Sequence, residues 1–155
     1  MKRRLFLAVL VVAAALSSSP ALAEIGRVKS SLGVATVQRG AAHMPAATGQ
    51  ALEAGDWLET GKDGRISLTF VDNTRFAIGP DSRIALKAFA YDATTQKGSF
   101  VARVERGTIA VVSGRITKTR CGGQTGGPPC GMTVETPDST LDINGTRFVL
   151  TVRRK

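Results

Sequence analysis

The chain holds few side chains whose type and spacing could perform chemistry. Its single histidine, His43, lies in a run of small residues, far along the sequence from the two cysteines, Cys121 and Cys130. Nucleophilic catalysis needs a base within hydrogen-bond reach of a serine or cysteine, and a metal site needs several ligands close together. Neither arrangement is present, so we predict a protein that is not an enzyme, with no catalytic residue, no cofactor and no bound metal.

The aspartates stand where turns are expected. Each one that could attract interest has Gly, Pro or Asn beside it, and a turn explains such an aspartate without any chemistry. A glycosidase needs two carboxylates facing one cleft, and a calcium loop needs regularly spaced ligands. The sequence shows neither pattern. The aspartates concerned are Asp56, Asp63, Asp72, Asp81 and Asp138.

Cys121 and Cys130 enclose a loop of glycines and prolines, Cys-Gly-Gly-Gln-Thr-Gly-Gly-Pro-Pro-Cys. A redox-active pair usually has only two residues between its cysteines, whereas this pair is wider and shows no helix signal. In an oxidising compartment such cysteines form a lasting bridge. We therefore predict a structural Cys121–Cys130 disulfide, which would stabilise the fold by roughly 2.7 kcal/mol on a chain-entropy model.

The amino-terminal segment has the order of a secretory signal. Positive residues at 2–4 precede an uncharged apolar run at 5–16, and small residues at 21 and 23 follow. The apolar run is shorter than the roughly 20 residues that a transmembrane helix needs, so an anchor is the weaker alternative. We predict cleavage between Ala23 and Glu24, a signal peptide over 1–23, one domain over 24–155, and a periplasmic or secreted location with no membrane span after cleavage.

Cleavage would leave 18 basic and 12 acidic residues, a net charge of 18 − 12 = +6. A basic exported protein can contact anionic lipid, lipopolysaccharide or wall polymer, although the same charge also serves solubility alone. The densest basic group, and the candidate contact with an anionic surface, comprises Arg115, Lys118 and Arg120. Nucleic acid is not an expected partner, because a single-strand binder interleaves its cations with aromatic platforms and this chain has few aromatic residues.

Alternating apolar and polar residues, punctuated by glycines, predict an all-β domain. The expected fold is a compact twisted β-sandwich or a short solenoid-like stack of about ten short strands, after an N-terminal signal helix. The segment 41–50 is expected to be a loop, and Trp57 is expected in the core. The predicted strands cover 33–40, 57–60, 65–70, 74–78, 83–90, 98–105, 108–113, 132–135 and 139–152.

Two segments of the chain echo each other. Leu-Thr-Phe-Val-Asp-Asn-Thr-Arg-Phe at 68–76 is similar to Leu-Asp-Ile-Asn-Gly-Thr-Arg-Phe at 141–148, and both contain a tight turn followed by Thr-Arg-Phe. Two copies of one hairpin could stack as rungs or pair across a sandwich, and coincidence between short strands is the alternative.

The order of these turns resembles the FecR domain family of periplasmic modules. The resemblance runs from the Gly33 and Gly40 turns through Gly55-Asp56-Trp57 and Asp72-x-Thr74 to Gly145-Thr146-x-Phe148, and the Cys121–Cys130 loop looks like an insertion. The family usually has glycine where this chain has Asn73, and often arginine where it has Asn144. The positions that carry the family motif, all with expected structural roles, are Gly55, Asp56, Asp72, Thr74, Thr136, Pro137, Gly145, Thr146 and Phe148.

The resemblance implies a non-enzymatic envelope module, either an adaptor or a signal-sensing domain. In the best-known members the domain is tied through a membrane helix to a cytoplasmic anti-sigma segment, and neither is expected here. The expected partner is another envelope protein, which edge strands would suit through strand addition. The alternative is a basic domain that binds anionic envelope polymers, such as peptidoglycan-linked polymers or lipopolysaccharide.

Overall fold

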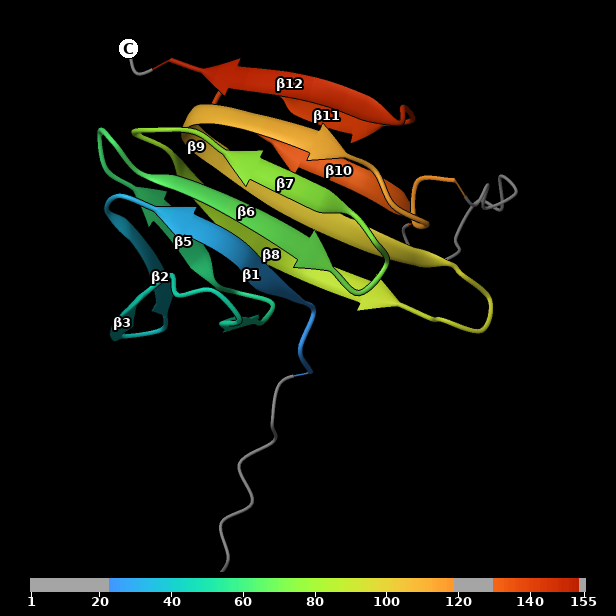
Figure 1. Cartoon of the computed structure of the whole chain (residues 1–155). Helices are drawn as coiled ribbons and strands as arrows, with labels where there is room; N and C mark the ends of the chain where they lie inside the picture. Colours follow the sequence, from blue (N-terminus) through green and yellow to red (C-terminus); the bar gives the residue numbers. More distant parts are fainter. Residues whose placement is uncertain (1–22, 119–129, 154–155) are drawn as a thin grey trace, which may run out of the picture.

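The computed structural model of the chain describes residues 23–118 and 130–153. It confirms the all-β class, with twelve strands and no helix in these residues (Figure 1). The predicted signal helix, and Cys121 of the predicted disulfide, lie outside the described residues. The strands are β1 (Gly26–Leu32), β2 (Ala35–Arg39), β3 (Ala42–Pro45), β4 (Ala51–Leu52), β5 (Trp57–Thr60), β6 (Arg65–Phe70), β7 (Arg75–Ile78), β8 (Arg83–Tyr91), β9 (Gly98–Val112), β10 (Gly131–Glu135), β11 (Thr140–Ile143) and β12 (Arg147–Val152).

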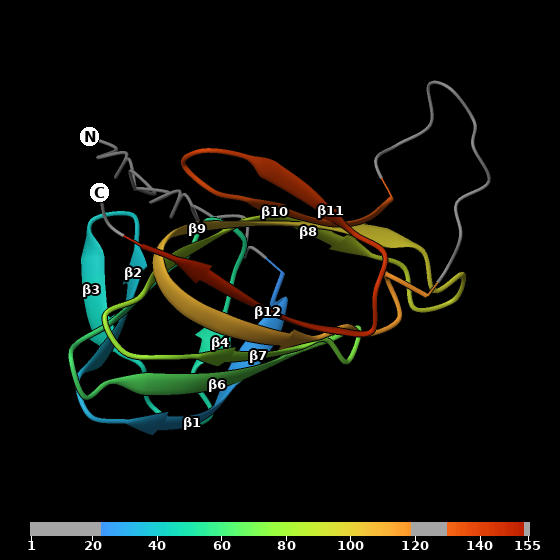
Figure 2. The same ribbon diagram turned by 90° about the horizontal axis from the view of Figure 1, so that it is seen from above.

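The long strand β9 organises the fold, because it curves and belongs to two arms of one sheet (Figure 2). The strand passes from one arm to the other at Gly107, since β8 pairs with β9 up to Arg106 and β12 pairs with it from Gly107. Gly107 has a φ of 97°, which favours glycine, and a Cβ there would collide with Ser82. Arm A holds β4, β1, β6, β7, the second half of β9 and β12, in that order. Arm B holds β3, β2, β5, β8, the first half of β9, β10 and β11. The result is a curled half-barrel and not a solenoid stack.

The two ends of the half-barrel differ. At one end the segment between β3 and β4 links the arms, since the Ala46 amide donates to the Ala35 carbonyl of β2 (3.0 Å) and the Gly49 amide to the Val28 carbonyl of β1 (2.8 Å). At the other end β11 and β12 each pair on one side only, β11 with β10 and β12 with β9. Of the strands that the structure describes, none pairs with their outer edges.

The core fills the space between the arms with alternate side chains from both. Phe70 and Phe76 from arm A meet Phe100 from arm B, with ring centroids 4.7 to 5.3 Å apart. Each aromatic pair of this kind adds about 1 kcal/mol beyond its buried area. Because each strand alternates, the residues between these core positions point out to two separate outer faces.

Three expectations about the elements were wrong. The segment 41–50 is not all loop, since Ala42–Pro45 forms β3 against β2. Strand β1 was not predicted, because a bulge between Val28 and Ser30 interrupts its alternation. The stretches 98–105 and 108–113, predicted as separate strands, are the single strand β9.

The sequence echo is not a repeated hairpin. Strands β6 and β7 do pair with each other, but β11 pairs with β10 in arm B and β12 pairs with β9 in arm A. The second copy therefore crosses from one arm to the other at its turn.

Candidate functional site

Asp56 lies in a network that ties the β4–β5 turn to β2. Its carboxylate is fully buried and accepts two hydrogen bonds from Arg39, both 2.7 Å, and a third from the Glu53 amide at 2.8 Å. Arg39 also donates to the Glu53 carboxylate at 2.6 Å. The hydrogen bonds to Asp56 raise the pKa of Arg39 above its ordinary value, against the opposing effect of burial. This network holds the turn and offers no free acid or base.

Asp72 closes the turn between β6 and β7 in the same manner. Its buried carboxylate accepts from the Thr74 amide at 3.0 Å and the Thr74 hydroxyl at 2.6 Å. The Thr74 hydroxyl in turn accepts from the Gly114 amide at 3.0 Å. Asn73 has a φ of 67° and occupies the turn position where the family usually has glycine. The Asp-x-Thr motif thereby joins the β6–β7 turn to the end of β9.

The later motif positions also make contacts within the fold. The Thr136 hydroxyl accepts from the Ser139 amide at 3.0 Å in the turn that contains Pro137. The carbonyl of Gly145 accepts from the Ser113 hydroxyl at 2.8 Å, and the carbonyl of Thr146 accepts from the Ser113 amide at 2.9 Å. Phe148 packs, half-buried, against the core.

The outer face of arm B carries a continuous network of ion pairs. Glu59 contacts Arg83 and Arg106, and Glu105 contacts Arg83 and Arg103. Glu135 then joins Arg103 to Lys87, the latter at 2.8 Å. Each of these cations therefore has a carboxylate beside it, although each exposed pair contributes little to stability.

Trp57 lies on this same outer face and not in the core, so that expectation was wrong. The ring is half-buried, and the Arg83 guanidinium lies 4.7 Å from its centroid. The neighbouring Leu58 takes the core position instead. The cation–π contact covers the ring on its outer side.

The outer face of arm A is different, because apart from Arg27, which pairs with Glu24, its cations have no carboxylate beside them. The side chains that point outward from its strands are mainly serine, threonine and alanine, with exposed lysine and arginine among them. Within the described part of the chain, these cations form no ion pair and no side-chain hydrogen bond. They are Lys29, Arg65, Arg75 and Arg147.

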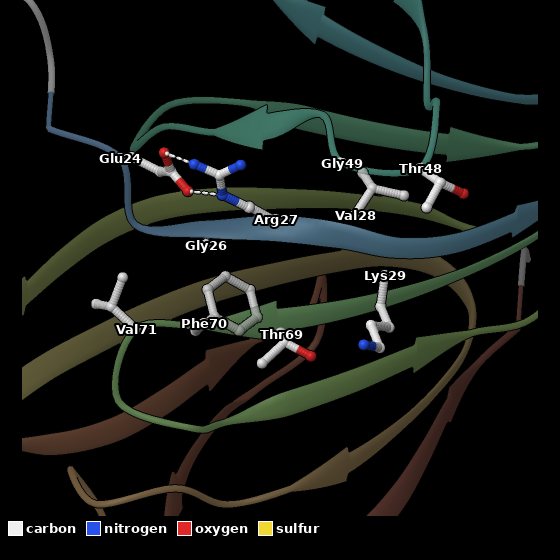
Figure 3. A pocket seen from close by; sticks show the side chains of 10 residues that line it. All are labelled: Glu24, Gly26, Arg27, Val28, Lys29, Thr48, Gly49, Thr69, Phe70 and Val71. Carbon is white, nitrogen blue, oxygen red and sulfur yellow. Dashed lines mark hydrogen bonds and ion pairs between the residues drawn. The ribbon is translucent and has the colours of Figure 1, made fainter.

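Two grooves mark this face. One, of about 450 Å³, lies at the start of β1 between the Thr48-Gly49 loop and the end of β6 (Figure 3), and a Glu24–Arg27 ion pair lies beside it. The other, of about 310 Å³, extends across β6, β7 and β9 to β12. Lys29 lines both grooves, and Figure 3 shows its side chain extending from β1 over β6.

The edge of β12 is the most regular open edge of the sheet. The strand pairs with β9 over all its six residues without a register shift, and it contains no proline. Its inward side chains Phe148, Leu150 and Val152 are only half-buried, while outward Val149 is 67% exposed. Edge strands of monomers are usually blunted by bulges, prolines or inward charges, and β12 has none of these.

The predicted basic group is only partly described. Arg115 and Lys118 are exposed in the turn after β9, and Arg120 lies outside the described residues. The predicted cleavage point is at the boundary of the described chain, where Ala23 and Glu24 are exposed. The signal peptide and the disulfide stay predictions.

In the residues that the structure describes, no His, Cys, Asp or Glu side chains gather in a group that could hold a metal ion. His43 is exposed on β3, opposite Gln38. The same residues include no apolar helix of membrane-spanning length.

Comparison with known protein families adds one match. The FecR protein family matches residues 56–155, which is more than half of the chain. The chain belongs to the FecR family. No curated protein and no solved structure matches it. The matched span begins at Asp56 and contains Asp72, Thr74 and the Thr146-Arg147-Phe148 segment.

Membership of the FecR family places the chain among domains that act in sensing and signal transduction, generally without enzymatic activity, and that are associated with the cell envelope. The motif positions of this FecR domain make turn and core contacts, as described above. Two surfaces of the described residues could receive a partner: the open edge of β12 and the outer face of arm A.

Proposed function

We propose that this FecR domain is a non-enzymatic adaptor or sensing module of the cell envelope, located outside the cytoplasm, which binds an extended segment of another envelope protein along β12. The open edge of β12 carries the proposal. Its backbone is positioned by β9 and offers hydrogen-bonding groups to an incoming strand, while its half-buried inward side chains offer apolar contacts. Family membership supports the sensing role.

The hydrogen-bonding register shows which groups of β12 are available. The Ser113 amide donates to the Thr146 carbonyl, so this pair belongs to the ladder between β9 and β12. In an antiparallel ladder, bonded and non-bonded positions alternate. Residues 148, 150 and 152 therefore direct their amides to β9, whereas Arg147, Val149 and Thr151 direct theirs to the open edge. A strand added to β12 would pair with those three.

The test removes one edge amide without disturbing the ladder. Proline at an edge position whose amide faces away from the sheet is tolerated, so Val149→Pro should fold. A photo-crosslinking residue at position 151, in the protein exported by living cells, should trap one envelope protein. We expect Val149→Pro to abolish that crosslink, because proline cannot donate to an added strand.

Val149→Ala is the matched control, since it removes the side chain but keeps the amide. It should retain most of the crosslink. Urea unfolding of both variants establishes that the fold is intact. Equal crosslinking in Val149→Pro and the control would contradict strand addition at β12.

Salt dependence distinguishes the anionic-polymer alternative from docking along β12. Binding to a polymer through Arg115, Lys118 and Arg120 should weaken steeply as salt rises, because exposed charges are screened. Apolar docking along β12 should change little over the same range. Nothing in the described structure favours this basic group over the strand edge.

A further inference from the structure

The echoed Thr-Arg-Phe segments occupy equivalent places on the two sides of β9. Arg75 of β7 and Arg147 of β12 are both register partners of Val112, and Phe76 and Phe148 are both partners of Val111. Both strands run antiparallel to β9. The echo therefore directs two phenylalanines inward and two arginines outward, one on each side of Val112.

These arginines belong to a wider row of cations on the outer face of arm A. Neighbouring strands lie about 4.8 Å apart, so the Cα atoms of Arg75 and Arg147 are separated by roughly 10 Å across Val112. Lys29 lines the same groove as both arginines, and Figure 3 shows its side chain extending from β1 over β6. The β1 bulge, which leaves Lys29 without a partner in the register, places it there.

The side chains between the cations are small, and two of them carry hydroxyls. Ser67, Thr69, Ala77 and Ala110 line the groove of about 310 Å³, so a bulky anionic group can approach the three cations. Glu24, which precedes β1 and already pairs with Arg27, is the acidic side chain nearest to this row among the groove residues. An anion at the groove would meet three charges without displacing an internal partner.

Two strongly exposed apolar side chains share this face. Leu32, at the end of β1, is 69% exposed and pairs in register with Arg65, and Val149 of β12 is 67% exposed and pairs with Ala110. Cations that alternate with exposed apolar side chains on one face match the boundary of a membrane, where phosphates lie above acyl chains. A soluble polyanion would make no favourable contact with the exposed apolar side chains.

We propose that the outer face of arm A binds the phosphate groups of an anionic lipid surface, with Lys29, Arg75 and Arg147 as the phosphate contacts and Leu32 and Val149 as shallow apolar contacts. This site is separate from the strand edge of the proposed function: it uses outward side chains, whereas strand addition uses backbone amides. It would hold the domain against a membrane while β12 remains open to a partner.

The test compares variants in vesicle binding. The exported protein, isolated as the cell processes it, is mixed with vesicles of phosphatidylglycerol and phosphatidylcholine in equal parts, or of phosphatidylcholine alone. Each cation near such a surface contributes about fivefold in affinity. Lys29→Gln/Arg75→Gln/Arg147→Gln should therefore weaken binding to the mixed vesicles on the order of a hundredfold. The unaltered protein should bind phosphatidylcholine vesicles weakly.

A matched triple variant controls for net charge. Lys87→Gln/Lys97→Gln/Arg103→Gln removes three positive charges from arm B and the β8–β9 turn, and it should lower binding by less than about fivefold, because these charges lie away from the membrane contact. An equal loss in both triple variants would overturn the proposal, since binding would then follow overall charge.

Leu32→Ser/Val149→Ser tests the apolar contacts. It keeps every cation and should weaken vesicle binding several-fold, with a loss that persists at about 500 mM salt, where charge interactions are screened within roughly 4 Å. Binding to soluble polyphosphate but not to vesicles, unaffected by Leu32→Ser/Val149→Ser, would overturn the lipid proposal in favour of a polymer. Val149→Pro retains all the cations, so failure of strand docking and failure of lipid binding are separable.

Discussion

The outer faces of the two arms belong to the same curled sheet, yet the cations are paired with carboxylates on one face and mostly unpaired on the other. On arm B, Glu59, Glu105 and Glu135 lie among the cations and form a continuous network. On arm A, Arg27 pairs with Glu24, whereas Lys29, Arg65, Arg75 and Arg147 have no carboxylate within ion-pair distance among the described residues, and serine, threonine and alanine lie between them. Cations that are already paired with carboxylates attract an anion only weakly, whereas unpaired cations can bind one.

The difference arises from which residue types occupy the outward positions of each strand. In β5, β9 and β10 the outward positions of arm B include glutamates, whereas β1, β6, β7 and β12 place none there. Inward positions are apolar in both arms, so the core is built in the same way. The two arms therefore build the core in the same way and differ in the side chains on their outer faces.

The largest expected effect comes from the buried carboxylate at the β4–β5 turn of arm B. Asp56→Asn should lower the free energy of unfolding by about 3 kcal/mol, because the amide nitrogen would face the Arg39 guanidinium and leave that charge poorly paired. Arg75→Gln on arm A should change it by less than about 0.5 kcal/mol, since Arg75 has no internal partner. Urea unfolding measures both. Similar values for the two would show that the charges of the arms do not differ in structural importance.

An intermediate effect is expected when arm B is made to resemble arm A. Glu59→Gln/Glu105→Gln/Glu135→Gln would leave Arg83, Lys87, Arg103 and Arg106 unpaired, with a loss of about 1 to 2 kcal/mol in stability because exposed ion pairs are weak. The variant should gain salt-sensitive binding to anionic vesicles, measured by flotation. If it gains none, unpaired cations alone do not make a binding face, and the apolar residues of arm A become the deciding feature.

The smallest effect concerns Asp92 in the turn between β8 and β9. Hydrogen bonds from the Thr94 amide (2.8 Å) and then the Thr95 amide (3.3 Å) hold the pKa of this exposed carboxyl below its ordinary value. A lowered folded-state pKa gives stability that is present above the unfolded-state pKa and lost as the pH falls through the folded value. An NMR titration of the carboxyl carbon should show the lowered pKa.

Asp92→Asn serves as the comparison for that titration, because it removes the charge and keeps the turn residue. Its stability should depend slightly less on pH in the acidic range than that of the unaltered protein. An ordinary pKa for Asp92 would mean that the turn is open in solution. The outer faces of both arms should be unaffected.

The sequence predicted those parts of the fold that depend on local rules. Strict alternation located β6 and β7, and the Asp72-Asn73 pair located the turn between them. Asp56, Asp72 and Thr74 of the family motif are buried in turns, consistent with the turn chemistry of their neighbours. Local rules were sufficient there because each strand pairs with the next one along the chain.

Predictions failed where distant strands decide the outcome. The bulge in β1 breaks the alternation, and only its pairing with β6 makes it a strand. Trp57 was predicted to lie in the core because of its residue type, but Leu58 takes the core position and Arg83 covers the Trp57 ring. Similarly, the second Thr-Arg-Phe segment has the sequence of a hairpin, yet β12 pairs with β9 and β11 pairs with β10.

The amino-acid sequence by itself determined the all-β class, the turns, and the family to which the chain belongs, because alternation and turn residues act over a few neighbours. Only the tertiary structure decided that Arg75 and Arg147 flank one residue of β9, that Lys29 reaches the same groove, and that β12 keeps an open edge. Those facts depend on which strands pair and in what register, and strand pairing joins residues that are far apart in the chain.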